Sequence, residues 1–185
     1  MSIVRSLMRP ALALVLLIGL AGCYQTEHEI FGPKEAAIIP GLAGRYSDGH
    51  GEWIITPIRH TPDYSVRNRS NPQDPPLRFR AVALGNDVYI MQLQVDPKKP
   101  NVYWHIVFQV MRKNGRIDEI TQLEPDDDAV KARVQQLSSV TLNPPPAGSL
   151  GDPETVVGPA DAVASLIKSI ATLPTKTETV FRRVN

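Results

Sequence analysis

The most reactive side chain in this sequence is the thiol of Cys23, the only cysteine of the 185-residue chain. A thiol can be alkylated, oxidised or bound to a metal, whereas a single cysteine cannot form a disulfide within its own chain. Cys23 directly follows Leu20, Ala21 and Gly22, at the end of the only strongly apolar run in the sequence. The sequence therefore places a modifiable nucleophile at the end of an apolar segment.

The apolar segment itself has the composition of a targeting signal. Arg5 and Arg9 supply positive charge before an unbroken apolar run over residues 11–20. A helix that spans a bilayer needs roughly 17 to 25 apolar residues, so this run is too short to be one. Its length and its flanking charge instead predict a processed signal peptide over residues 1–22.

The stretch Leu20-Ala21-Gly22-Cys23 resembles the lipobox of bacterial lipoprotein signal peptides. The resemblance implies that the Cys23 thiol receives a diacylglycerol, that the signal is cut before it and that the new amino terminus is acylated. Two or three acyl chains on one residue hold a domain stably at a membrane, which one chain alone does not. In such proteins an Asp after the cysteine tends to cause retention in the inner membrane. Tyr24 at that position therefore favours the outer membrane, with the domain facing the periplasm.

Metal and catalytic chemistry have little support in the sequence. The triple aspartate over residues 126–128 lacks the alternating spacing of a calcium loop, so we expect it to cap a helix. No nucleophile–base pair or nucleotide-binding loop stands out, and we predict no cofactor, no metal and no enzyme. The histidines do not have the close spacing of a zinc motif; they are His28, His50, His60 and His105.

Two sets of side chains could contact a ligand. The aromatic residues Trp53, Tyr89, Trp104 and Phe108 lie on predicted strands, where they either fill the core or line a cavity for an apolar ligand. Arg78 and Arg80 lie on the strand face opposite Phe79. We expect these two arginines to be solvated, with a contact to an acidic headgroup or a partner carboxylate as the alternative.

Charge balance argues against nucleic acid as a partner. The chain has 20 Lys and Arg against 19 Asp and Glu, and two of the arginines lie in the predicted signal. Residues 23–185 then carry 18 basic and 19 acidic residues, a net charge of −1. No basic run or basic face stands out, so binding to phosphate backbones is not expected.

Hydrophobic periodicity predicts the elements of one domain over residues 41–185. Residues 23–40 are poorly periodic and interrupted by proline, and we interpret them as the lipidated cysteine and a flexible tether. From Gly41 onward the period is two, and Asn114-Gly115 is a strong hairpin signal. The expected strands cover residues 43–47, 52–58, 64–67, 77–84, 88–95, 102–111 and 116–123.

The period changes to that of a helix after Pro125. One helix is expected near Val130, Val134 and Leu137, and a stronger one over residues 160–173, followed by a last strand over residues 178–184. The prediction is an α+β fold in which an antiparallel β-meander forms a curled sheet or small open barrel. Two C-terminal helices, one of which plugs a face, and a final strand complete it.

These features leave three functional hypotheses. The first is a lipid-anchored protein of the bacterial cell envelope that acts as a non-enzymatic accessory factor by contacting envelope protein partners. The second is a binder of a lipid or a small apolar ligand in the concave face of the sheet. The third, an enzyme, lacks any catalytic constellation in the sequence. A large apolar cavity favours the second hypothesis, and an exposed apolar patch or a bare sheet edge favours the first.

Overall fold

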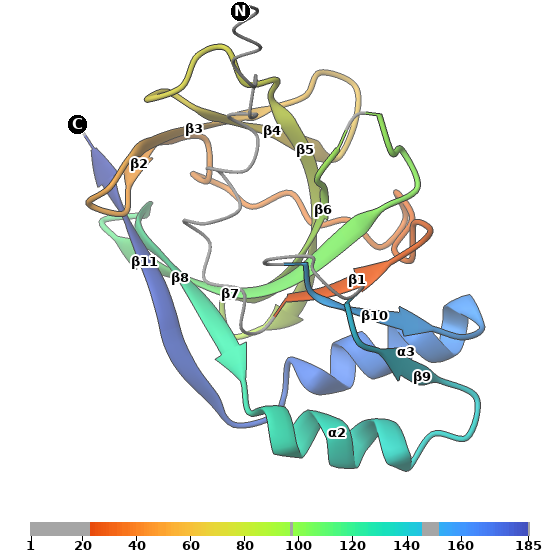
Figure 1. Cartoon of the computed structure of the whole chain (residues 1–185). Coiled ribbons are helices and arrows are strands. Elements are labelled where there is room, and N and C mark those ends of the chain that lie inside the picture. The colour runs from red at the N-terminus through yellow and green to blue at the C-terminus, as the bar shows by residue number, and fades with distance from the viewer. Residues whose placement is uncertain (1–22, 97, 146–151, 185) are drawn as a thin grey trace, which may run out of the picture.

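The protein is built on a closed, eight-stranded β-barrel, which Figure 1 views down its axis. The computed structural model describes residues 23–96, 98–145 and 152–184. Neighbouring barrel strands are antiparallel, in the order β6-β5-β4-β3-β2-β11-β8-β7, and β6 pairs with β7 to complete the ring. The barrel strands are β2 (Gly44–Ser47), β3 (Glu52–Pro57), β4 (Asp63–Asn68), β5 (Leu77–Gly85), β6 (Val88–Gln94), β7 (Tyr103–Lys113), β8 (Arg116–Pro125) and β11 (Thr175–Val184).

The meander expected from the sequence is confirmed, and its alternating pattern explains the barrel wall. On β5, Phe79 and Ala81 point into the barrel core, whereas Val82 packs in a second core outside it. The hairpin between β7 and β8 turns at Asn114 and Gly115, whose φ angles are 53° and 75°. Two adjacent residues with positive φ match the twist of the paired strands, and Asn-Gly adopts this conformation readily.

The expectation of an open barrel is wrong because the last strand closes the ring. Strand β11 pairs with β8 along one edge, from Thr175 to Arg182, and with β2 along the other, from Arg182 to Val184. Unpaired strand edges expose backbone donors and acceptors, and closure satisfies them. A strand that starts at Thr175, three residues before the expected start, is long enough to reach both neighbours.

The expectation of a flexible tether over residues 24–40 is also wrong. Residues Cys23–Thr26 form β1, which pairs antiparallel with Tyr103–Ile106 of β7 and parallel with β10 (Glu154–Val157). β10 pairs in turn with β9 (Thr141–Asn143), and neither strand is among those expected from the sequence. The next residues are fastened to the outside of β6, because Gln92 Oε1 accepts hydrogen bonds from the amides of Ile30 and Phe31, each at 2.9 Å.

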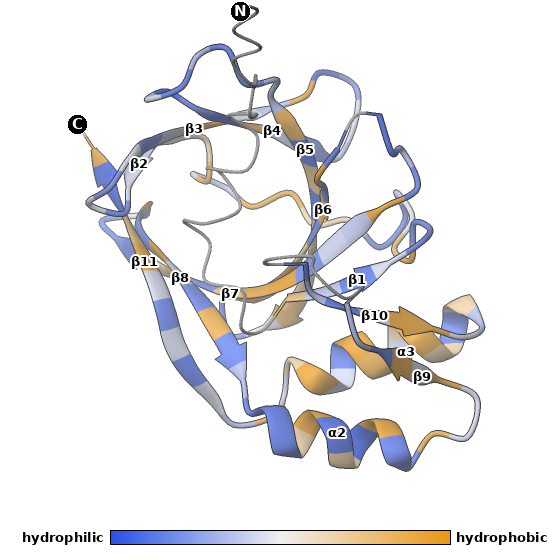
Figure 2. Ribbon diagram, in the orientation of Figure 1, coloured by the Kyte–Doolittle hydropathy of each residue, from blue (hydrophilic) through white to orange (hydrophobic). Residues whose placement is uncertain are grey.

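Two helices lie within the described residues, α2 (Asp127–Gln135) and α3 (Ala160–Ile170). They pack on the outside of the barrel wall, where α3 covers one face of the sheet. Figure 2 shows that α3 is mainly hydrophobic and α2 mainly hydrophilic. The second core joins α3 to the outer faces of β1, β5, β6 and β10; its α3 residues are Val163, Leu166, Ile167 and Ile170. None of the described helices is long and apolar enough to span a membrane.

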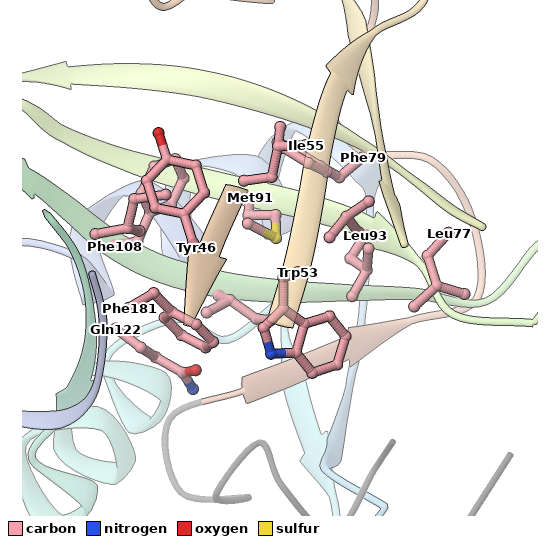
Figure 3. Close-up of a pocket in the computed structure, with 13 residues that line it drawn as sticks. Tyr46, Trp53, Ile55, Leu77, Phe79, Met91, Leu93, Phe108, Gln122 and Phe181 are labelled. Atoms are coloured by element: carbon pink, nitrogen blue, oxygen red, sulfur yellow. The ribbon is translucent and has the colours of Figure 1, made fainter. Parts of the chain in front are cut away.

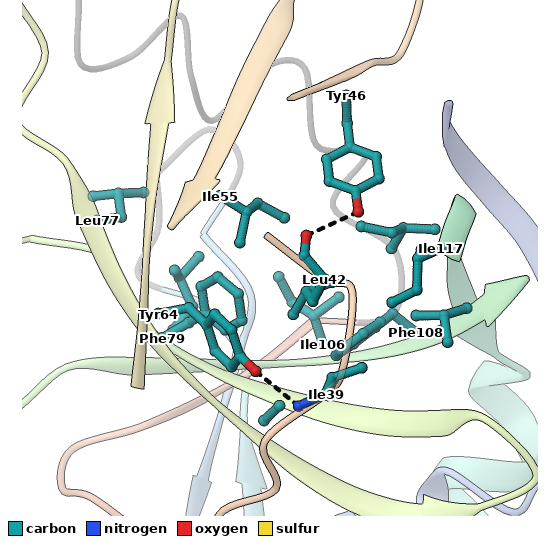
Figure 4. Packing of buried hydrophobic residues seen from close by; sticks show 14 of the residues in the cluster. Ile39, Leu42, Tyr46, Ile55, Tyr64, Leu77, Phe79, Ile106, Phe108 and Ile117 are labelled. Atoms are coloured by element: carbon teal, nitrogen blue, oxygen red, sulfur yellow. Dashed lines mark hydrogen bonds between the residues drawn. The ribbon is translucent and has the colours of Figure 1, made fainter. Parts of the chain in front are cut away.

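The barrel is plugged at one end by residues 36–43. Ile39 and Leu42 are buried in the barrel core, and tyrosines on the wall bond to the backbone of the plug (Figure 4). The Tyr64 hydroxyl accepts a hydrogen bond from the Ile39 amide at 2.7 Å, and the Tyr46 hydroxyl donates to the Leu42 carbonyl at 2.8 Å. The supposed tether therefore supplies the plug.

Candidate functional site

The candidate site is an apolar cavity of about 90 Å³ in the barrel lumen (Figure 3). It is formed by inward-facing positions of the barrel strands, because every second residue of a strand points to the same face. The lining residues are Tyr46, Trp53, Ile55, Val66, Leu77, Phe79, Met91, Leu93, Ile106, Phe108, Ile120, Gln122 and Phe181. Among them, Gln122 is the residue that brings an amide into otherwise hydrophobic surroundings, and this amide lies close to Phe181 and Trp53.

A small polar cluster surrounds Gln122. Its amide nitrogen Nε2 donates to Glu178 Oε2 at 2.5 Å and lies 4.0 Å from the sulfur of Cys23. The second carboxylate oxygen of Glu178, Oε1, is buried and has no hydrogen-bond partner among the described residues. The cluster joins β1, β8 and β11. β8 pairs with β7 from Val107 onward, β1 pairs with the preceding residues of β7, and β11 pairs with the other edge of β8.

Burial controls the protonation of this cluster. Burial raises the pKa of Glu178 from 4.5 to about 7, and repulsion from Glu124 adds to this, while the hydrogen bond from Gln122 and the charge of Lys176 oppose it. The pKa of Cys23 is raised to about 12, first by burial and then by the nearby Glu178. Where the structure places it, the thiol is therefore protonated at neutral pH and is a poor nucleophile.

The structure divides the four aromatic residues that the sequence singles out. Trp53 and Phe108 line the cavity. Tyr89 stacks on Phe108 with ring centroids 5.4 Å apart and packs against the barrel core without lining the cavity. Trp104 is buried beside β1, where its indole Nε1 donates to Gln25 Oε1 at 3.2 Å. Trp104 thus contacts β1, a neighbour that periodicity along β7 alone does not reveal.

Sequence reasoning missed Gln122 and Glu178. A usable signal was present on β8, because Gln122 and Glu124 continue the inward-facing positions of Ile120 with polar side chains. Glu178 had no such signal. The register between β11 and β8 shifts between Thr177 and Thr179, so Glu178 lies in a β-bulge. At a bulge, the alternation of inward and outward side chains along the strand no longer predicts which face a residue is on.

The expectation that Arg78 and Arg80 are solvated is wrong for Arg80. Its side chain is 7% exposed and donates from Nε to Asp63 Oδ1 at 2.7 Å, with a second ion pair to Glu29. Arg78 also pairs with Asp63. Both arginines thus use their charge within the protein, and Glu29 links the N-terminal segment to the wall.

The remaining polar residues of interest have structural partners. His105 is fully buried, its Nε2 lies 2.9 Å from Thr26 Oγ1, and burial lowers its pKa to about 3, so the ring is neutral. Asp126 caps α2 as expected, accepting from the amide of Ala129 at 2.9 Å. Across residues 23–96, 98–145 and 152–184, no group of three or more His, Cys, Asp or Glu residues is placed to hold a metal ion.

Comparison with known proteins adds no relative. No protein-family model, curated protein or solved structure matches this chain. The lipobox residues Leu20, Ala21 and Gly22 lie outside the described residues.

Proposed function

We propose that this protein is a lipid-anchored protein of the bacterial cell envelope whose barrel binds a small apolar ligand, or the end of a single acyl chain. The observation that carries the binding function is the cavity inside a closed barrel, lined by Trp53, Phe79, Phe108 and other apolar side chains. Ligand sites of proteins are typically concave, mostly apolar and provided with a few polar groups, which is the composition of this lumen.

The size of the cavity limits the ligand. An engineered protein cavity of roughly 150 Å³ takes up benzene. A lumen of about 90 Å³ suits a smaller apolar group, or a few methylenes at the tip of a longer chain. Whole two-chain lipids are far too large for it.

Support for the anchor comes from the sequence alone. The positive residues, the short apolar run and the stretch Leu20-Ala21-Gly22-Cys23 together fit a lipoprotein signal, with the lipid on Cys23. Outer-membrane sorting, favoured by Tyr24, is part of the same proposal.

The anchor has a structural consequence for Cys23. This side chain is 4% exposed and packs in the barrel core, and a diacylglyceryl group on its sulfur cannot fit in the lumen. Modification must therefore withdraw Cys23 from the barrel. Since Cys23 begins the proposed mature chain, the withdrawal costs one terminal residue of β1, while Tyr24, Gln25 and Thr26 can keep their pairing with β7.

The surface gives less support to a function based on partner proteins. The exposed large hydrophobic residues among those described are Ile38, Met111 and Val157, which lie on the plug, on β7 and on β10. Single exposed apolar side chains are normal on soluble domains, whereas docking surfaces usually form contiguous patches. The lumen is therefore the better supported site.

The test is native mass spectrometry of the full chain, expressed with its signal in a bacterium and purified gently from membranes. We expect an extractable apolar compound to copurify with the wild type and to be lost from Val66→Phe, because the phenylalanine ring is larger than the valine side chain and fills the lumen. The matched control Val157→Phe places the same ring on the surface, where the side chain is 40% exposed, and should retain the compound. A wild-type mass that the polypeptide and the lipid on Cys23 account for in full, or equal retention by Val66→Phe, would contradict lumen binding and redirect the search to crosslinking of envelope partners.

A further inference from the structure

We infer that the ligand of the lumen is a single-chain amphiphile with a hydrogen-bond-donating, uncharged or cationic head, a hydroxyl or an amine, which binds at the polar cluster of Gln122 and Glu178. This inference rests on the proposed function, since it assumes that the lumen takes up an apolar chain. It adds the chemical class of the head and the residues that select it.

The first support is the position of Glu178. The bulge in β11 places this residue out of register with Gln122 and Leu123 of β8. A bulge re-aims a side chain, and bulges are over-represented next to functional sites. Here the redirected carboxylate reaches Gln122, which lines the cavity. Glu178 is thus one hydrogen bond from the apolar lumen.

The second support is the unused acceptor. Glu178 Oε2 receives the amide of Gln122, but Oε1 is buried without a partner among the described residues. Gln122 has no further donor to offer, because the two hydrogens of its Nε2 are directed to Glu178 and to the Cys23 sulfur. Buried polar atoms nearly always have partners, so an orphaned acceptor beside a cavity calls for a donor from a ligand.

The third support is the charge around the cluster, which selects against anions. Glu124 of β8 repels the charge of Glu178, and Lys176 on β11 is held by Glu124 at 3.0 Å, with the neutral thiol of Cys23 on the β1 side. The cation near Glu178 is therefore already paired. When Glu178 is ionised, a carboxylate or phosphate head meets like charge here, whereas an amine or a hydroxyl meets an acceptor.

The proposed withdrawal of Cys23 strengthens the site. When the sulfur leaves, the second hydrogen of Gln122 Nε2 loses its contact, and the space of the cysteine side chain joins the polar end of the cavity. The head of the ligand can then accept a hydrogen bond from Gln122 and donate one to Glu178. A hydroxyl can do both, because it is a donor and an acceptor.

The experiment is isothermal titration of the chain from Cys23 to Asn185, which contains every residue of both cores. The probes are four short chains of equal length: butan-1-ol, butylamine, butanoate and methyl propyl ether. We expect the alcohol and the amine to bind about tenfold or more tightly than the ether, because only they supply the missing donor, and butanoate to bind most weakly.

Variants assign the selection to Glu178. In Glu178→Leu the alcohol and the amine should lose their advantage, while the ether keeps its affinity. Glu27→Leu, on an exposed residue away from the lumen, should leave all four affinities unchanged. Should Glu178→Leu fail to fold, Glu178→Gln keeps the side-chain size and should reduce the preference for the amine over the ether.

The outcomes distinguish failure of the proposed lumen function from failure of the proposed head class. If none of the four probes binds, the proposed lumen function itself fails. If all four bind equally, or butanoate binds best, or Glu178→Leu leaves the ranking unchanged, the lumen function stands and the inference about the head is overturned.

Discussion

The Tyr64 hydroxyl on the barrel wall accepts a hydrogen bond from the backbone amide of Ile39 in the plug, at 2.7 Å. Tyr64 is 3% exposed and Ile39 is 3% exposed, so both partners lie away from water. The Tyr64 ring also stacks on Phe79, which lines the cavity, with ring centroids 5.2 Å apart. Tyr64 therefore connects the plug to the wall of the cavity.

Loss of the Tyr64 hydroxyl should therefore loosen the plug. In Tyr64→Phe the buried Ile39 amide has no acceptor, and we expect the free energy of unfolding to fall by about 1–3 kcal/mol. Urea denaturation of the chain from Cys23 measures this change. Tyr89→Phe is the control, since the Tyr89 hydroxyl contacts the side chains of Asp87, at 3.4 Å, and Arg112 rather than an amide of the plug; an equal loss in both variants would contradict a specific role for the Tyr64 bond.

Asp63 should be far more important to stability than an exposed acidic residue. Its side chain is 1% exposed and pairs with both Arg78 and Arg80, so Asp63→Ala leaves the buried guanidinium of Arg80 with only Glu29 as an anionic partner. We expect a loss of about 3–5 kcal/mol, the usual cost of breaking a buried ion pair.

The matched control for Asp63 is Glu52→Ala, which removes the exposed pair with Arg69. Exposed pairs contribute about 0–1 kcal/mol, so this variant should unfold close to the wild type. Thermal and urea denaturation at neutral pH give both values, and similar losses in the two variants would contradict the buried network.

Glu178 should make stability depend on pH in the direction opposite to most carboxyl groups. Its pKa rises from 4.5 to about 7 on folding, so between these values the folded chain binds a proton that the unfolded chain releases. The contribution of protonated Glu178 is complete below pH 4.5 and is lost as the pH rises through about 7.

Urea denaturation of the wild type and Glu178→Gln across that range tests the pH effect. The wild type should lose stability relative to Glu178→Gln between pH 5 and pH 8, because the amide cannot ionise. Glu27→Gln corrects for general effects of charge removal. A constant difference between wild type and Glu178→Gln at all pH values would show that Glu178 has its ordinary pKa in the folded protein.

The anchor makes an independent prediction. In cells that are fed a labelled fatty acid, Cys23→Ala should abolish acyl labelling of this protein, because it removes the only thiol in the chain. Tyr24→Phe keeps the cysteine and should be labelled like the wild type. Continued lipid incorporation into Cys23→Ala would contradict the anchor without affecting the lumen.

The local elements of the fold could be predicted from the sequence because their signals are local. Alternation of polar and apolar residues specifies the strands, Asn114-Gly115 specifies a hairpin, and the spacing of Val163, Leu166, Ile167 and Ile170 specifies the buried stripe of α3. Each signal depends on residues that are close together in the sequence. Likewise the proposed lipid site at Cys23 depends only on the residues beside it.

Tertiary structure alone decided the closure of the barrel, the plug and the polar cluster. Strand β11 closes the ring against β2, and β1 enters the sheet beside β7 and β10, through pairings between residues far apart in sequence. A short segment such as Cys23–Thr26 has too few residues for a periodic pattern, and its partners supply the stability that its own sequence does not. For the same reason Cys23, Gln122 and Glu178, which the sequence separates widely, meet only when three strands from different parts of the chain fold around one lumen.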